Sequence, residues 1–189
     1  MALPAPLRQL PNQLTVARVA AVPVLCLFIA MGNGWLRWLA LFIYVAAAVT
    51  DWFDGFLARR MNMQSDFGRM LDPIADKLLV GCLIVTFAWT RDFWGLDLMP
   101  AIAILMREIF VSGLREYMGK REVTVPVTFL AKWKTTVQLV TLFFFILQGL
   151  LPGFNFIADL LLWIAGLLTV WTGWQYLQSV MPYFGAPTE

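Results

Sequence analysis

The sequence predicts an all-α integral membrane protein with six transmembrane helices, both termini in the cytosol and an active site at the cytosolic end of the bundle. Three observations predict this fold: the composition, six apolar segments and an uneven distribution of Lys and Arg. Of the 189 residues, 60% are hydrophobic and only 14% are charged, and the mean hydropathy is +0.73. Soluble domains are about half apolar and about a quarter charged, so this composition excludes an ordinary soluble protein.

Six segments are long enough to cross a bilayer, which takes about 20 residues. The last two are the clearest, because residues 135–158 and 160–188 carry no charge. The second to the fourth have uncharged runs that are too short to span alone, so each must carry ionisable residues at one end. The six expected spans are residues 14–31, 37–59, 69–90, 98–118, 129–150 and 156–182.

The positions of Lys and Arg predict the orientation of these spans. The chain has 14 Lys and Arg, and only Arg37 and Arg91 lie on one side of the expected bundle. Cytosolic segments are enriched in these residues, and the number of spans is even, so we expect both termini in the cytosol. The other twelve lie on the cytosolic side: Arg8, Arg18, Arg59, Arg60, Arg69, Lys77, Arg107, Arg115, Lys120, Arg121, Lys132 and Lys134.

The amino terminus does not resemble a targeting segment. Residues 1–11 contain three prolines and one Arg, without a small-residue cleavage site behind a short apolar core. We therefore expect a multi-pass protein of the bacterial inner (plasma) membrane that contacts membrane lipids and has no nucleic-acid partner. The whole chain, 1–189, is expected to form one domain, with residues 1–13 as a cytosolic juxtamembrane lead-in.

The sequence contains no His and only two Cys. Cys26 and Cys82 lie in apolar stretches without neighbouring metal ligands, so they are expected to behave as small hydrophobic residues. Without His, a general base must be a carboxylate or, less favourably, a Lys or Tyr.

Four aspartates interrupt the second and third expected spans. Asp51 and Asp54 close one apolar run, and Asp72 and Asp76 precede the next. An ionised carboxylate near a bilayer costs on the order of 3 kcal/mol on insertion scales, and four together repel one another. Something cationic is therefore expected to hold them.

Helical spacing places these carboxylates on defined faces. Asp51 and Asp54 are about 60° apart around a helix, and the small residues Gly55 and Ala58 fall on the same arc. The two helices are expected to be antiparallel around a short cytosolic turn. That arrangement brings the four carboxylates to a similar depth, facing one another.

An oxygen-only cluster suits two hard cations, Mg²⁺ or Mn²⁺, which also attract a diphosphate. One alternative is that the aspartates only form ion pairs with neighbouring Arg and Lys, although ion pairs do not explain the interleaved Gly and Ala. A proton or cation pathway is a second alternative, because intramembrane acids often serve transport. A pathway predicts acids spread over the membrane depth, whereas these four cluster at one face.

The spacing of these residues resembles the signature of the CDP-alcohol phosphotransferases. The chain reads Asp-x-x-Asp-Gly-x-x-Ala-Arg over residues 51–59 and, after eight further residues, Gly-x-x-x-Asp-x-x-x-Asp over 68–76. All eight signature positions are filled. The resemblance implies six transmembrane helices, a homodimer, and transfer of a phosphatidyl group from a CDP-lipid to an alcohol with release of CMP.

The resemblance also implies roles for individual residues. Two metal ions would be bound by four ligands, and the last of these, Asp76, would double as the general base. The implied metal ligands are Asp51, Asp54, Asp72 and Asp76. The residues implied for the cytidine diphosphate site are Asp54, Gly55, Ala58, Arg59 and Gly68.

A basic region between residues 106 and 136 indicates the acceptor. A phosphate-bearing alcohol needs cationic donors, and Arg matches phosphate oxygens with two parallel N–H groups. A neutral acceptor does not require such a concentration of charge. Alternatively, these side chains only enforce orientation and attract anionic headgroups. The candidate acceptor-phosphate ligands are Arg107, Ser112, Arg115, Lys132 and Lys134.

Three local patterns resemble the glycerol-phosphate branch of the same family: residues 107–116, residues 132–135, and Pro-Asn-x-Leu-Thr-x-x-Arg at 11–18 followed by Pro23. One departure is Ala131, where that branch usually has Gly. Asn12, Thr15 and Arg18 could contact the nucleotide or its diphosphate. They could equally form a helix cap with an interfacial anchor.

The expected activity is that of a metal-dependent transferase of phospholipid biosynthesis. CDP-diacylglycerol and sn-glycerol 3-phosphate would give phosphatidylglycerophosphate and CMP. The alternatives are the same chemistry with inositol phosphate, phosphatidylglycerol or serine as acceptor, and an ion-coupled transporter. A membrane prenyltransferase would need more spans and two well-separated acidic motifs.

Overall fold

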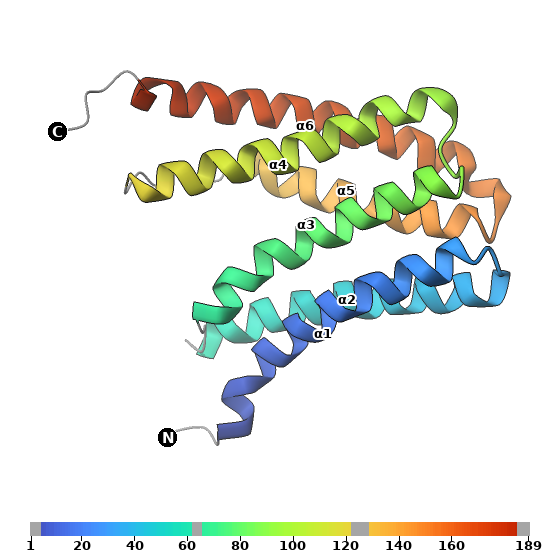
Figure 1. The fold of residues 1–189 in the computed structure, drawn as a ribbon, viewed down its shortest axis with the longest axis horizontal. Helices are drawn as coiled ribbons and strands as arrows, with labels where there is room; N and C mark the ends of the chain where they lie inside the picture. The colour runs from blue at the N-terminus through green and yellow to red at the C-terminus, as the bar shows by residue number, and fades with distance from the viewer. Residues whose placement is uncertain (1–4, 62–65, 122–128, 185–189) are drawn as a thin grey trace. The chain divides into compact units, whose positions relative to one another are not determined.

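The computed structural model describes the backbone of residues 5–61, 66–121 and 129–184 (Figure 1), and the side chains of 13–51, 68, 70–121 and 129–184. These residues form α-helices and short 3-10 helices, and no strand occurs among them. The α-helices are α1 (Ala5–Ala30), α2 (Gly34–Met61), α3 (Asp66–Trp89), α4 (Leu98–Lys120), α5 (Phe129–Gln148) and α6 (Asn155–Phe184). The 3-10 helices are η1 (Gly95–Asp97) and η2 (Pro152–Phe154).

The all-α prediction is confirmed, and each expected span falls on one α-helix. The largest difference is at α1, which begins at Ala5 rather than near residue 14. Hydropathy marks where an apolar run begins, whereas helical hydrogen bonding extends into the polar residues that precede it. The start of α1 therefore lies well before the apolar run that predicts this helix.

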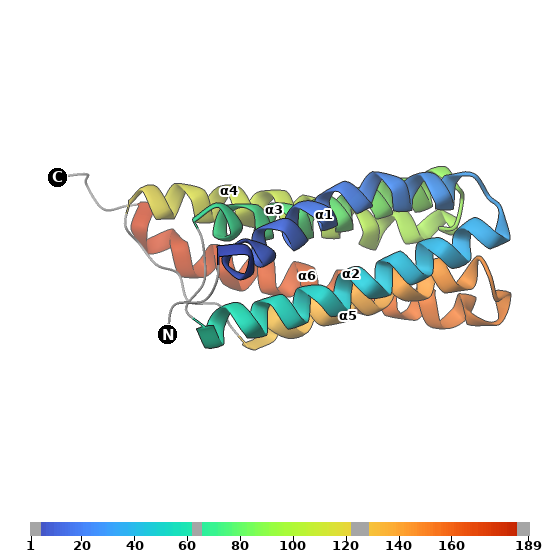
Figure 2. The ribbon, with the colours of Figure 1, turned by 90° about the horizontal axis from the view of Figure 1, so that it is seen from below.

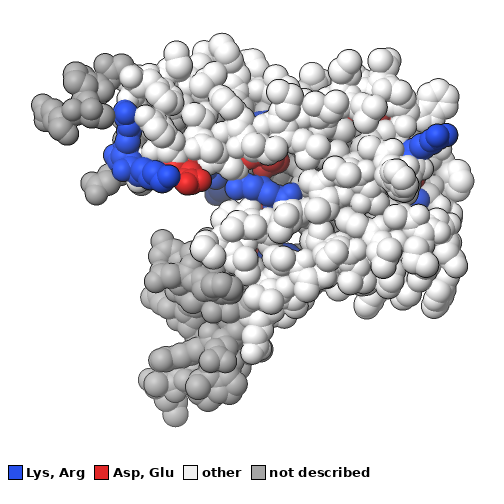
Figure 3. Space-filling view, viewed as in Figure 1, with Lys and Arg blue, Asp and Glu red and all other residues white. Residues whose placement is uncertain are grey.

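Among the residues that the structure describes, four helical segments are long and apolar enough to cross a membrane: Gln13–Ala30, Gly34–Asp51, Phe129–Gln148 and Pro152–Phe184. The helices α3 and α4 are 24 and 23 residues long, but each carries more than two charged residues along its length. On the face drawn in Figure 3, uncharged side chains dominate, and Lys, Arg, Asp and Glu are few. The six-span count and the cytosolic termini stay predictions.

The chain folds into two compact units. Unit 1 comprises residues 1–92 and 145–152, and unit 2 comprises residues 93–144 and 153–189. In unit 1, α1 packs against both α2 and α3 (Figures 1 and 2). In unit 2, α4 packs against α6. The division passes through α5, whose last residues belong to unit 1.

Two left-handed residues end helices in unit 1. Gly32, with φ 68°, follows α1, and its N–H donates to the carbonyl of Ile29. Arg91, with φ 58°, follows α3, and the next N–H, that of Asp92, reaches back to the carbonyl of Phe87 at 2.9 Å. Helices commonly end with one left-handed residue in this way, usually Gly. These ends set the start of α2 and the position of Asp92.

Small residues bring α6 close to α4 in unit 2. A Cβ atom on Gly166 would lie 2.5 Å from Cβ of Pro100, and one on Gly173 would lie 3.1 Å from Cγ of Arg107. The buried residues of α6 include Thr169, Gly173, Tyr176 and Val180, which recur every three or four positions and so share one helix face. This face covers the polar residues of α4 described below.

Candidate active site

Two of the four predicted aspartates contact α1. The hydroxyl of Thr15 donates a hydrogen bond to Oδ1 of Asp72 on α3 at 2.8 Å. A guanidinium nitrogen of Arg18 lies 2.5 Å from Oδ1 of Asp51 on α2. Thr15 and Arg18 are only 4% and 5% exposed, so burial holds each side chain in place. The helix α1 therefore forms a third wall of the aspartate site, beside the two helices that carry the signature.

The spacing of these two α1 residues explains how one helix serves two neighbours. Thr15 and Arg18 are three residues apart, which puts them about 60° apart around α1. One side chain therefore reaches α3 and the other reaches α2. Both partners are carboxylates, whereas a helix cap bonds a backbone N–H. Contact of these residues with the nucleotide or its diphosphate stays a prediction.

The remaining predicted residues of this site are only partly described. Gly68 is half-buried and Asp76 is exposed, both in unit 1. The side chain of Asp51 is 49% exposed, and Asp72 is exposed as well. Five residues predicted for this site lie outside those whose side chains are described: Asn12, Asp54, Gly55, Ala58 and Arg59.

The carboxylates provide oxygen ligands of the kind that Mg²⁺ and Mn²⁺ prefer. Among the described residues, no group of three or more potential ligands lies close enough together to hold a metal ion. Asp54, one of the four implied ligands, lies outside that set. Asp51, Asp72 and Asp76 therefore offer accessible oxygen ligands of the type that a hard divalent cation binds.

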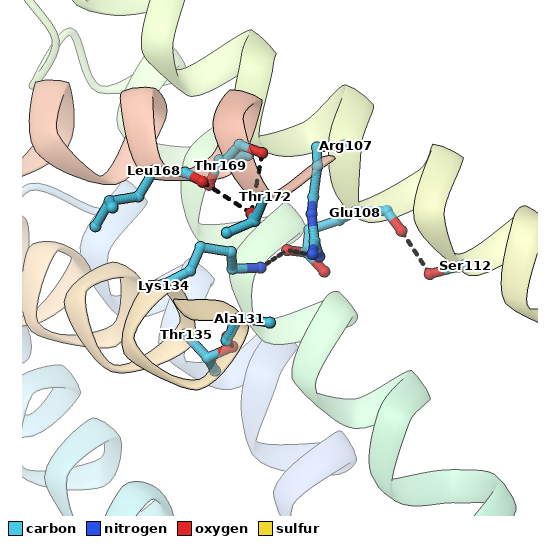
Figure 4. A network of polar contacts seen from close by, with 9 residues as sticks. All are labelled: Arg107, Glu108, Ser112, Ala131, Lys134, Thr135, Leu168, Thr169 and Thr172. Atoms are coloured by element: carbon cyan, nitrogen blue, oxygen red, sulfur yellow. Dashed lines mark hydrogen bonds and ion pairs between the residues drawn. The ribbon is translucent and has the colours of Figure 1, made fainter. Parts of the chain in front are cut away.

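A second polar centre lies in unit 2, around Glu108 of α4 (Figure 4). Its carboxylate oxygen Oε1 forms an ion pair with the ammonium of Lys134 on α5, and the same oxygen lies 3.5 Å from a guanidinium nitrogen of Arg107. The side chains of Lys134, Arg107 and Glu108 are 4%, 12% and 16% exposed. One carboxylate thus holds two buried cations together.

Arg115 adds a third cation to this centre. Its Cζ lies 5.5 Å from the centre of the Tyr176 ring on α6, a cation–π distance. The positive charge of Arg115 is close enough to repel those of Arg107 and Lys134. We call Arg107, Glu108, Arg115, Lys134 and Tyr176 the cationic cluster.

Two predicted acceptor ligands, Ser112 and Lys132, do not join the cationic cluster. The hydroxyl of Ser112 donates to the backbone carbonyl of Glu108 at 2.5 Å, within α4. Lys132 is exposed, and its position two residues before Lys134 places it about 160° away around α5. The structure therefore brings three of the five predicted ligands together.

Sequence reasoning missed the roles of Glu108 and Tyr176 in this cluster. Glu108 was visible as the neighbour of Arg107, and an acid next to a basic residue in an apolar segment is a signal for an internal counter-ion. Tyr176 gave no signal, because it lies in an uncharged apolar run where a ring is expected to pack against neighbours. Only the α4–α6 packing places it at the cluster.

From the sequence, Arg37 was considered only as a charge that indicates membrane orientation. In the structure it is also a buried residue that links several segments of unit 1. Its guanidinium lies 2.9 Å from Oδ1 of Asp92 and donates to the carbonyls of Phe145 and Ile146 at 3.0 and 3.1 Å. The Gln148 amide donates to the carbonyl of Asp92 at 3.0 Å. These bonds tie the start of α2 and the end of α3 to the last turn of α5.

Comparison with known proteins identifies the family. Residues 8–171 match the sequence profile of the family described as CDP-alcohol phosphatidyltransferase. That match covers most of the chain and includes both halves of the aspartate signature. It also includes the α1 residues that contact the aspartates.

The chain is also similar to curated proteins named CDP-diacylglycerol–glycerol-3-phosphate 3-phosphatidyltransferase. It is 44% identical to the protein of that name from Rickettsia bellii over 180 residues, covering 93% of this chain and 97% of the relative. The Pectobacterium atrosepticum protein is 41% identical over 175 residues, covering 90% and 93%. The Cereibacter sphaeroides protein is 37% identical over 212 residues, covering 92% and 96%. The chain therefore belongs to the CDP-alcohol phosphatidyltransferase family.

Proposed function

We propose that this protein transfers the phosphatidyl group of CDP-diacylglycerol to sn-glycerol 3-phosphate, giving phosphatidylglycerophosphate and CMP. The observation that carries the choice of acceptor is the cationic cluster, in which Arg107 and Lys134 pair with Glu108 and Arg115 lies over the ring of Tyr176. The names of the relatives support the same acceptor.

The charge of the cluster matches a phosphate monoester. Three cations and one carboxylate leave a net charge of +2, and a phosphate monoester carries roughly −1.5 to −2 near neutral pH. Lys134 and Arg107 are nearly buried, so water screens them little. Glycerol, serine and inositol carry no phosphate and would leave this charge unbalanced.

The donor substrate is proposed to bind at the aspartate site. Arg18 lies against Asp51 and Thr15 against Asp72, so α1 fixes the orientation of one carboxylate on each signature helix. Asp51, Asp54, Asp72 and Asp76 would hold two Mg²⁺ or Mn²⁺ ions. Bound there, the ions would supply the positive charge that a diphosphate and a departing CMP require.

Asp76 is proposed as the base. Its carboxylate takes the proton of the acceptor hydroxyl as the acceptor oxygen forms a bond to the lipid-bearing phosphorus. The bond from that phosphorus to the CMP oxygen breaks, and CMP leaves with the bonding electrons. Exposure of Asp76 fits a base that must meet a water-soluble acceptor.

The proposed location is the bacterial inner membrane, with six spans and both termini in the cytosol, and a homodimer as the assembly. The donor is a lipid and the acceptor a cytosolic metabolite, so a site at the cytosolic boundary serves both. The four long apolar segments support insertion in a bilayer.

The experiment is CMP release from CDP-diacylglycerol by purified protein, with sn-glycerol 3-phosphate, inositol phosphate, phosphatidylglycerol, serine, glycerol and inositol as separate acceptors. The proposal predicts the highest kcat/KM with sn-glycerol 3-phosphate and phosphatidylglycerophosphate as the lipid product. Equal or better turnover with a neutral polyol overturns the assignment of the acceptor. Absence of CMP release with every acceptor and divalent metal overturns the enzyme class.

A further inference from the structure

Tyr176 occupies a position on α6 where a ring alone would satisfy the packing. It is 8% exposed, and its ring belongs to a buried cluster with Val111 and Met118 of α4 and Val180 of α6. Its hydroxyl oxygen is buried and has no hydrogen-bond partner among the described residues. A buried hydroxyl without a partner is destabilising, and Phe at this position would avoid that cost.

The hydroxyl belongs to a ring that already contacts a cation of the cluster. Arg115 stacks on the ring, with its Cζ 5.5 Å from the ring centre. Gly173, one helical turn earlier, lets the aliphatic part of Arg107 lie against α6, because a Cβ there would be 3.1 Å from Cγ of Arg107. The ring of Tyr176 therefore contacts one cation of the cluster, and a second cation packs against α6 one turn away.

Other donors around the cluster are also without partners. Nε of Arg107 and the hydroxyl of Thr169 are buried and make no hydrogen bond within the part of the chain that the structure describes. Thr169 lies on the same face of α6 as Tyr176, seven residues earlier, and Figure 4 draws it together with Arg107 and Lys134. Unused donors beside a net positive charge are suited to an anion with several acceptor oxygens.

We propose that Tyr176 is a further binding residue for the acceptor's phosphate group, with its hydroxyl donating to a phosphate oxygen and its ring holding Arg115 in place. This inference rests on the proposed function, since it assigns a residue to the same acceptor. It makes α6 a third contributor to the phosphate site, beside α4 and α5.

The hydroxyl is tested with Tyr176→Phe, which keeps the ring and the packing with Val111 and Met118. One lost hydrogen bond to a charged group corresponds to a rise of about tenfold in KM for sn-glycerol 3-phosphate. The KM for CDP-diacylglycerol and the kcat are expected to stay within twofold of wild type. The matched control is Tyr44→Phe, which removes a hydroxyl at 3% exposure in unit 1 and should leave both KM values unchanged.

The ring is tested by combining Tyr176 variants with Arg115→Met. In the Tyr176→Phe background the ring still holds Arg115, so Arg115→Met should raise the acceptor KM further. In the Tyr176→Leu background the ring that holds Arg115 is absent, so Arg115→Met should raise the acceptor KM by less than a further twofold. Circular dichroism and thermal unfolding report whether Tyr176→Leu is folded; if it is not, the Tyr176→Phe result alone decides.

Failure of this inference differs from failure of the proposed function. If wild type releases no CMP with sn-glycerol 3-phosphate, the proposed function falls and takes the inference with it. If wild type is active and Tyr176→Phe keeps a wild-type acceptor KM, only the inference is overturned. Equal losses for both substrates in Tyr176→Phe and Tyr44→Phe would likewise show a structural role and overturn it.

Discussion

The hydroxyl of Thr15 on α1 donates to Oδ1 of Asp72 on α3 across 2.8 Å. Thr15 is 4% exposed, so its hydroxyl is shielded from water and held in place. A hydrogen bond from a fixed hydroxyl sets the direction in which the other carboxylate oxygen points. Outer hydrogen bonds of this kind orient metal ligands and tune their affinity.

Thr15→Val should weaken divalent-metal activation while leaving the fold intact. Valine has the shape of threonine without the hydroxyl, so the carboxylate of Asp72 loses its orientation. Loss of an outer-shell hydrogen bond typically costs 10–100-fold in metal affinity, so the Mg²⁺ concentration for half-maximal CMP release should rise about tenfold.

The control is Thr50→Val on α2, whose hydroxyl donates to the carbonyls of Ala46 and Ala47 in its own helix. It should keep a wild-type Mg²⁺ dependence. If Thr15→Val and Thr50→Val give the same Mg²⁺ curve, the hydrogen bond to Asp72 plays no part in metal binding.

Removal of divalent cations should abolish CMP release reversibly. Four carboxylates repel one another and a diphosphate, so the donor needs the proposed cations to bind. Activity is measured after dialysis against EDTA and again after adding Mg²⁺ or Mn²⁺, with circular dichroism as a check on folding. Full activity in the chelated protein would contradict the metal assignment.

Arg37→Met should destabilise unit 1 strongly. The guanidinium pairs with Asp92 and donates to two carbonyls of α5, and both charged side chains are largely buried, at 9% and 12% exposed. Removing one partner of a buried pair costs about 3–5 kcal/mol, because the other charge is left uncompensated.

Thermal unfolding in detergent, followed by circular dichroism, measures this effect. The control is Arg91→Met, an exposed neighbour of Asp92, whose cost should stay within about 0.5 kcal/mol. Equal stability of the two variants would show that the Arg37 contacts are not maintained in solution.

Gly166→Ala should destabilise the packing of α4 on α6. The new Cβ would lie 2.5 Å from Cβ and 3.0 Å from Cα of Pro100, and a proline backbone cannot move aside as a flexible side chain can. Overpacking of this kind costs about 1–3 kcal/mol. Gly113→Ala in α4 meets nothing within 4 Å and should be neutral or stabilising by up to about 1 kcal/mol. A higher melting temperature for Gly166→Ala than for Gly113→Ala would refute the close approach.

The sequence predicted the helices because apolar runs of about 20 residues have few alternatives in a membrane protein. The aspartate signature could be recognised directly, because its Asp, Gly and Ala positions lie within one short stretch of the sequence. The contacts of Thr15 and Arg18 were left open because they are long-range: a hydroxyl three residues from an Arg is equally a cap, an anchor or a ligand holder. Only the packing of α1 against α2 and α3 shows which carboxylates they reach.

The same limit applies to the cationic cluster. Arg107, Arg115 and Lys134 were identified by charge in an apolar context, which is a strong local signal. The part played by Glu108 depends on whether α5 brings Lys134 to it, and that of Tyr176 on whether α6 faces α4. The contacts of Arg37 could not be predicted for the same reason, since its partners Asp92, Phe145 and Ile146 lie 55 to 109 positions away.

The central claim is that the cationic cluster recognises the phosphate of the acceptor, and the ratio of kcat/KM for sn-glycerol 3-phosphate to kcat/KM for glycerol tests it most directly. Lys134→Met removes one buried cation that faces Glu108, and a loss of about 2–5 kcal/mol is typical for such a pair. The ratio should therefore fall roughly a hundredfold. Lys120→Met, which removes an exposed cation paired with Glu116, should keep the wild-type ratio. An unchanged ratio in Lys134→Met, or an equal fall in both variants, would contradict the account.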